Sequence, residues 1–220
     1  MFNRVFVQNP IPSPIDKREI LRYAGVKGDV DEQTETLLND CVALAQTAIM
    51  PRVCYRVYAA NDLLAELGVE SELLKNKLCK AKYAVVFGAS VGVEADRLIM
   101  RFSNLSPAKS AMLQAVFTER IESVCDGFCA EIEKGCVEKG MRAGSRFSAG
   151  YGDFSIEKQT WFFKALDITK KIGVTLSDGL LMMPTKSVTA IVPIYLEKRE
   201  ETGGCASCEN KACLFRKEGE

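Results

Sequence analysis

The chain has 220 residues, of which 47% are hydrophobic and 26% are charged, a balance typical of one globular domain with or without a small appendage. Acidic and basic residues number 29 each, so the formal net charge is zero, and no basic stripe indicates a nucleic-acid partner. No apolar run is long enough to span a bilayer and no signal-peptide core follows the first residues, so we expect a cytoplasmic protein without a membrane partner.

The first half of the chain alternates helical and extended patterns. Asp16–Tyr23 and Asp31–Met50 carry apolar residues at helical spacing, and acidic residues gather at the start of the second segment, as a helix dipole favours. Val53–Ala59 and Tyr83–Gly88 are rich in β-forming residues and predict strands. Two further helices are predicted over residues 71–80 and 95–102.

The second half begins with a longer helical pattern. Pro107 opens a helix that runs to about Lys134 with a continuous apolar stripe, and another helix is predicted over Ser155–Ile168. Three strands are predicted after it, over residues 174–176, 180–183 and 187–196. Pro193 lies inside the last strand and favours an edge position in the sheet. Long helices mixed with short strands, without βαβ regularity, predict an α+β fold.

The composition changes at residue 197, which predicts a domain over residues 1–196 and an appendage over 197–220. The appendage is a polar tether followed by three closely spaced cysteines, Cys205, Cys208 and Cys213. Such thiolates favour an iron–sulfur cluster or zinc, with a fourth ligand from Cys136, another cysteine or a second chain. The alternatives are a redox-labile free trio of cysteines and a disordered tail. The other six cysteines mostly lie in apolar patterns and are interpreted as small buried side chains.

One motif has the form of a hydrolase nucleophile. Gly88-Ala-Ser90-Val-Gly92 follows a predicted strand and precedes a helix, as the nucleophile elbow requires. The chain contains no histidine, so a Ser-His-Asp or Cys-His system is excluded, as is a histidine ligand for a metal. We therefore interpret the two glycines as residues of a strand-to-helix turn.

A glycine-rich run, residues 144–153, carries a different set of groups. Arg146 offers a fork of donors suited to a carboxylate, and Tyr151 offers a flat face with a polar tip. The glycines allow the backbone to approach a ligand closely. Taken alone, the run is also that of an ordinary glycine-rich turn with a surface arginine.

Together with two later segments, this run resembles a known domain. Arg146-Phe-Ser-Ala-Gly-Tyr151, the helical run from Ser155 and Met183-Pro184-Thr-Lys-Ser-Val188 are similar in order and spacing to the activation (reactivation) domain of cobalamin-dependent methionine synthase, in its short stand-alone form. The similarity extends from about Leu113 to Ile194. In that family an Arg-x-x-x-Gly-Tyr segment wraps S-adenosylmethionine, usually as Arg-Pro-Ala-Pro-Gly-Tyr, and in this chain Phe147, Ser148 and Ala149 occupy the middle three positions. The resemblance implies a twisted antiparallel sheet flanked by helices.

The resemblance also implies roles for individual residues. Arg146 would bind the carboxylate of S-adenosylmethionine. The adenosine would lie against four residues, Ser148, Ala149, Gly150 and Tyr151. The ammonium and sulfonium need carboxylates or carbonyls, and the candidates are Glu119, Glu122 and Asp153. Glu119 and Glu122 are three residues apart on one helix, and a solvated helix face is the alternative interpretation. Lys186 and Ser187 either frame the pocket or start the last strand.

The implied function is the reactivation of a cobalamin enzyme. The chain would bind S-adenosylmethionine and support the reductive remethylation of cob(II)alamin held by a separate methionine synthase or corrinoid partner, with an electron donor such as flavodoxin or ferredoxin. The cobalt is the nucleophile, so the chain would position the methyl group as a component of a methyltransferase of methionine biosynthesis rather than act as a complete enzyme. The alternatives are a ligand-free scaffold of the same fold and a redox accessory protein that delivers electrons through the Cys-rich tail.

Overall fold

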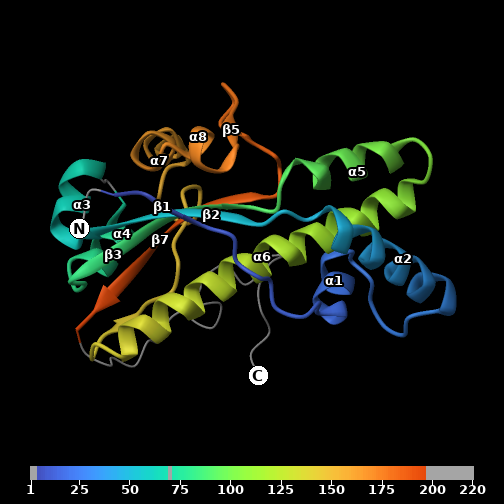
Figure 1. Ribbon diagram of the computed structural model, residues 1–220, viewed down its shortest axis with the longest axis horizontal. Coiled ribbons are helices and arrows are strands. Elements are labelled where there is room, and N and C mark those ends of the chain that lie inside the picture. The colour runs from blue at the N-terminus through green and yellow to red at the C-terminus, as the bar shows by residue number, and fades with distance from the viewer. Residues whose placement is uncertain (1–3, 69–70, 197–220) are drawn as a thin grey trace.

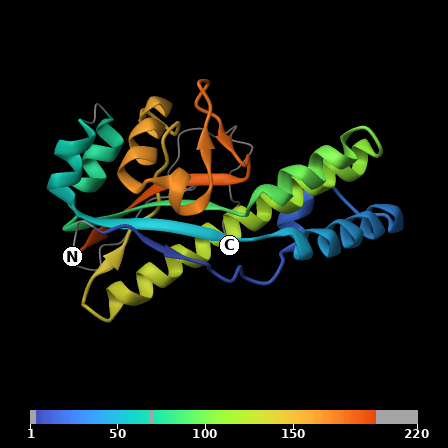
Figure 2. The ribbon, with the colours of Figure 1, turned by 45° about the horizontal axis from the view of Figure 1, so that its top comes forward.

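The computed structural model describes residues 4–68 and 71–196, which form a layered α+β structure (Figures 1 and 2). A five-stranded antiparallel sheet in the order β1-β2-β3-β7-β4 has helices on both faces. The fold class predicted from the sequence is confirmed. The predicted boundary after residue 196 and the whole appendage lie outside the described residues.

The sheet is built around one long central pair of strands. β3 (Tyr83–Ser90) and β7 (Ser187–Tyr195) are in register from Tyr83 opposite Ile194 to Ser90 opposite Ser187. β2 (Arg52–Ala59) pairs with the other side of β3, and the short β1 (Phe6–Gln8) forms the edge beyond it. On the opposite side β4 (Arg142–Ala143) pairs with the end of β7. A separate hairpin joins β5 (Thr175–Leu176) to β6 (Met182–Met183).

The edge position predicted from Pro193 is wrong, because β7 has a neighbour on each side. The amide nitrogen and the carbonyl of one strand residue point to the same side, and the carbonyl of Pro193 accepts a hydrogen bond from Gly144 at 2.7 Å. β4 has already ended at Ala143. The missing N–H of Pro193 therefore faces Gly144, just beyond the end of β4, where regular pairing is interrupted before it resumes at Phe147 and Ile191.

α6 (Pro107–Val137) covers one face of the sheet, and α1 (Lys17–Tyr23), α2 (Glu32–Ala48) and α5 (Val93–Ser103) pack chiefly against α6. α6 runs along almost the whole molecule, with its first turns beside α5 and α2 and its later turns beneath the sheet (Figure 1). Val85 and Phe87 of β3 and Val192 of β7 point into this layer, where the ring of Phe87 meets Phe128 of α6 at 5.0 Å between centroids. α6 thus supplies much of the core on this side.

The other face carries shorter elements: α3 (Ala60–Leu67), α4 (Glu72–Leu78), the 3-10 turn η1 (Ile156–Lys158), α7 (Gln159–Leu166) and α8 (Ile168–Ile172). Ala84, Val86 and Ile191 point into this layer, so β3 and β7 are buried on both faces and read as nearly continuous apolar runs. The single helix predicted over residues 155–168 is wrong in its continuity. Asp167, with φ of 51°, ends α7 in the left-handed region, and α8 begins at the next residue.

Candidate functional site

Arg146 reaches from the segment after β4 to the side of α6. Its Nη2 pairs with the carboxylate of Glu122 and lies 3.3 Å from Oδ1 of Asp126, which is one helical turn further along. Its Nη1 is buried and has no hydrogen-bond partner within the described part of the chain. The structure therefore brings together two predicted site residues, Arg146 and Glu122, that are 24 positions apart. It also leaves one guanidinium donor unsatisfied.

The glycine-rich segment is fixed to the sheet at its start and folds back on itself. Phe147 and Ile191 of β7 exchange both backbone hydrogen bonds, at 2.8 and 2.9 Å. Gly150 (φ 92°) then donates to the carbonyl of Phe154 at 2.7 Å. Ser148 is half-buried, Ala149 is buried in the core below the segment, and the side chain of Tyr151 is 60% exposed. The segment is thus an ordered turn that carries an exposed aromatic ring.

The two left-handed glycines of this turn also pack against the chain itself. A Cβ at Gly150 would come within 3.0 Å of Ile156 Cδ1, and one at Gly152 within 2.8 Å of Leu73 Cδ1. Both neighbours are partly exposed apolar side chains. The glycines are therefore required by the fold as well as being suited to a ligand.

Asp153 caps α4. Its carboxylate accepts hydrogen bonds from the hydroxyl of Ser71 and from the backbone N–H groups of Glu72 and Leu73, at 2.7 and 3.3 Å for the two amides. These bonds, above all that from Ser71, lower the pKa of Asp153. The structure gives this residue a role in joining the glycine-rich turn to α4.

Glu119 and Glu122 have different partners. Glu119 is 5% exposed and pairs with Arg120, which is 3% exposed. The Glu119 carboxylate also accepts from the backbone N–H of Asp16 at 3.2 Å, while Arg120 donates to the carbonyl oxygens of Ser13 and Pro14 at 2.8 and 3.4 Å. The two side chains form a clasp that holds the segment before α1 against α6.

The segment that the clasp holds leads into α1, and α1 carries Tyr23, a residue that the sequence analysis did not identify. Asp16 caps α1 through hydrogen bonds from Arg18 and Glu19, and Tyr23 is the last residue of that helix. Burial, followed by the negative charge of Glu122, raises the pKa of Tyr23 to about 12. Tyr23 is therefore a neutral phenol close to the Glu122–Arg146 pair. No spacing in the sequence links it to that pair.

Lys186 lies on the same side of α6 as Arg146. Its Nζ donates to Oγ1 of Thr118 at 2.9 Å, and burial lowers its pKa against a smaller, opposing effect of Asp96. Asp96 on α5 binds the backbone N–H of Thr185 at 2.7 Å and its hydroxyl at 2.6 Å. Thr185 and Lys186 are thereby tied to α5 and α6, respectively.

The nucleophile-elbow motif is structural. Ser90 is 1% exposed, accepts a hydrogen bond from the N–H of Gly92 at 3.1 Å and one from the hydroxyl of Ser187 at 3.0 Å. Gly92 has φ of 96° and starts α5. These contacts explain the two glycines as turn residues and leave Ser90 out of reach of a substrate.

The cysteines of the described residues are free thiols, and most of them are buried. Burial raises the pKa of Cys41 to about 11 and that of Cys54 to about 12, so both are protonated at neutral pH. Cys136, considered as a fourth metal ligand, is also buried. No group of metal-binding side chains occurs within residues 4–68 and 71–196. Cys205, Cys208 and Cys213 lie outside the described residues.

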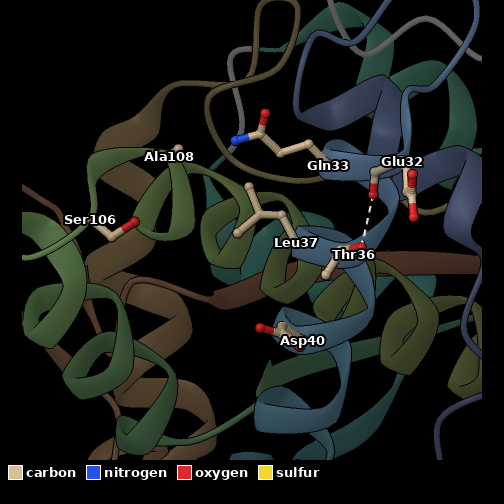
Figure 3. Close-up of a pocket in the computed structure, with 7 residues that line it drawn as sticks. All are labelled: Glu32, Gln33, Thr36, Leu37, Asp40, Ser106 and Ala108. Atoms are coloured by element: carbon tan, nitrogen blue, oxygen red, sulfur yellow. Dashed lines mark hydrogen bonds between the residues drawn. The ribbon is translucent and has the colours of Figure 1, made fainter.

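A shallow hollow of about 540 Å³ lies elsewhere, between the first turns of α2 and the start of α6 (Figure 3). It is lined by Glu32, Gln33, Thr36, Leu37, Asp40, Ser106 and Ala108. None of the predicted site residues lines it.

Within the described ranges, no helix has both the length and the apolar character that crossing a bilayer requires.

Comparison with known proteins gives a fold and no family. No family model matches the sequence, and no curated protein matches it either. Among solved structures, the chain is similar to the crystal structure of the MetH reactivation domain bound to AdoHcy, with a TM-score of 0.60 and 16% identity, over 90% of this chain and 81% of the other. A nitroreductase family protein from Streptococcus pneumoniae TIGR4 matches with a TM-score of 0.37 and 9% identity, over 81% of this chain and 86% of the other. The first likeness supports the fold that the resemblance implied.

Proposed function

We propose that this chain binds S-adenosylmethionine between the glycine-rich segment and α6. The observation that carries the proposal is the convergence of Arg146, Glu122 and the 147–151 turn in a fold whose solved example holds AdoHcy. The unsatisfied Nη1 of Arg146 suits an acceptor that a ligand carboxylate would bring. The exposed ring of Tyr151 and the backbone of Ser148–Gly150 offer a flat surface and polar groups for adenosine.

The activity that fits this site is the reactivation of a cobalamin enzyme. A separate methionine synthase or corrinoid protein would hold cob(II)alamin, and a donor such as flavodoxin or ferredoxin would supply one electron. The bound S-adenosylmethionine would supply the methyl group to the cobalt of that partner's cofactor, leaving S-adenosylhomocysteine. The chain's own residues bind and orient the ligand and exchange no proton with it, which agrees with the absence of histidine.

Calorimetric titration of the full chain with S-adenosylmethionine, beside an Arg146→Ala variant, tests the proposal. We expect binding in the micromolar range, about −8 kcal/mol, that weakens when Arg146 is lost. Lys164→Ala, at an exposed position of α7, is the matched control and should bind as the original chain does. Folded protein that does not bind the ligand would contradict the proposal.

A second candidate is a scaffold of the same fold that binds no S-adenosyl ligand. Two observations favour it: Arg146 is already paired with two carboxylates, and the space above Gly150 and Gly152 is filled by Ile156 and Leu73. The same titration separates the two candidates. The third alternative, electron delivery through Cys205, Cys208 and Cys213, rests on residues outside the described chain. A Cys208→Ser variant that binds the ligand but does not support reactivation would favour that alternative.

A further inference from the structure

Two cations lie along one side of α6. Thr118, Glu122 and Asp126 follow one another at intervals of four residues and therefore share a face of the helix, which we call the α6 stripe. Lys186 is bound to the first of them and Arg146 to the other two. The anchor points of the two cations are one helical turn apart, roughly 5–6 Å between Cβ atoms.

The two cations differ in how far their charge is compensated. Arg146 pairs with Glu122 and Asp126, so this group of three carries no net positive charge. Lys186 has no carboxylate within 4.0 Å among the described residues, and its hydrogen bond goes to the neutral hydroxyl of Thr118. Both oxygens of Asp96, the carboxylate that acts on it electrostatically, already accept hydrogen bonds from Thr185. Lys186 is therefore the cation along the stripe that has no paired carboxylate among the described residues.

A half-buried ammonium that is not directly paired with a carboxylate favours binding of an anion. One of its three N–H donors is used by Thr118, so two remain for a ligand. Next to it along the stripe is the Glu122 carboxylate, which can face a positive group. The order along α6 is thus a cation, Lys186, and then an anion, Glu122, which complements a zwitterion.

We infer that Lys186 is a second cation of the ligand site and binds the carboxylate of the S-adenosyl ligand beside Arg146, while Glu122 faces its ammonium. This inference rests on the proposed function and specifies it. It assigns recognition of the amino-acid end of the ligand to the α6 stripe, and recognition of the adenosine end to the glycine-rich turn. Arg146 then has two tasks, which are to donate through Nη1 and to hold Glu122 in place.

The test uses two ligands that differ at the proposed contact. S-adenosylhomocysteine carries the amino-acid group, and 5′-methylthioadenosine keeps the adenosine and the thioether but lacks the carboxylate and the ammonium. We expect Lys186→Met to raise the Kd of S-adenosylhomocysteine about tenfold to a hundredfold and to leave that of 5′-methylthioadenosine unchanged. Lys186→Arg should recover part of the loss, and Lys164→Met on α7 should change neither Kd.

The outcomes separate the two proposals. If the original chain binds neither compound, both the proposed function and the role of Lys186 are overturned. If it binds S-adenosylhomocysteine and Lys186→Met binds it equally well, only the inference about Lys186 is overturned. An equal loss for both ligands also overturns it, because it would indicate a change in the fold. Thr118→Val provides a second variant if Lys186→Met does not fold. It should raise the Kd of S-adenosylhomocysteine by several-fold and leave that of 5′-methylthioadenosine unchanged.

Discussion

The buried clasp between Glu119 and Arg120 allows a sharp prediction about stability. The two side chains are 6% and 4% exposed, and their other partners are backbone groups of residues 13–16. In Glu119→Gln the amide oxygen still accepts from Asp16, but the new NH2 group faces an N–H of Arg120, so the change removes the charge and one hydrogen bond and leaves the Arg120 guanidinium buried without a counter-ion. Breaking such a pair costs about 3–5 kcal/mol, a large part of the roughly 5–15 kcal/mol that stabilises a typical domain.

Urea unfolding measures this loss directly. For a chain of this size the same change corresponds to a fall in Tm of roughly 6–20 °C. Glu19→Gln is the matched control, since it removes a partly exposed ion pair with Arg22 on α1 and should cost less than about 1 kcal/mol. If Glu119→Gln lost no more free energy of unfolding than Glu19→Gln, the clasp would not be a buried pair of the kind described.

A double variant extends the reasoning. Because an isolated buried charge is the source of the cost, Glu119→Gln combined with Arg120→Met should be more stable than Glu119→Gln alone. The carbonyl groups of Ser13 and Pro14 that lose their donor can turn to water at the surface. Simple addition of two destabilising effects would contradict this explanation.

Three further predictions concern the glycines and the α4 cap. Gly152→Ala should destabilise the fold by about 1 kcal/mol, because φ is +57° and the new Cβ meets Leu73. Gly127→Ala, inside α6 with open space around it, should stabilise the fold by roughly 0.5–1 kcal/mol. Urea unfolding of the two variants measures both changes. The hydrogen bond from Ser71 and two amides lowers the pKa of Asp153, so its contribution is complete above the ordinary value of 3.8 and is lost as the pH falls through the lower value of the folded state. Asp153→Asn should therefore lose less free energy of unfolding than the original chain when the solution is acidified. Equal losses in the two proteins would refute this role of Asp153.

Sequence periodicity predicted most of the regular structure, because an element that buries one face has apolar residues at regular spacing. The long helix from Pro107 and the two central strands were found with ends close to those observed. The elements that were missed lack such signals. β1 and β4 have three and two residues, and α3 begins at Ala60 without a side-chain cap. The edge position was wrong because the pattern cannot show that β4 pairs with β7 only as far as Ala143, next to Pro193.

The candidate site was predictable only where the sequence itself carries chemistry. Arg146 was identified from the composition of its segment and Glu122 as a candidate for the ammonium of the ligand that the resemblance implies, but their pairing depends on β4 and α6 lying side by side. Asp126, Tyr23 and the partner of Glu119 could not be found in this way. Adjacent helix residues such as Glu119 and Arg120 ordinarily face apart. Here the segment of residues 13–16 gives them a common partner, which the sequence pattern of the helix cannot show.

The central claim is that an S-adenosyl ligand binds where the glycine-rich turn meets the α6 stripe. Amide hydrogen exchange of the full chain, with and without saturating S-adenosylhomocysteine, tests it most directly. The account predicts added protection in residues 146–151 and in the turns of α6 around Thr118–Asp126, and none in the hollow between α2 and the start of α6. Protection confined to that hollow, or no change in protection at any amide, would contradict it.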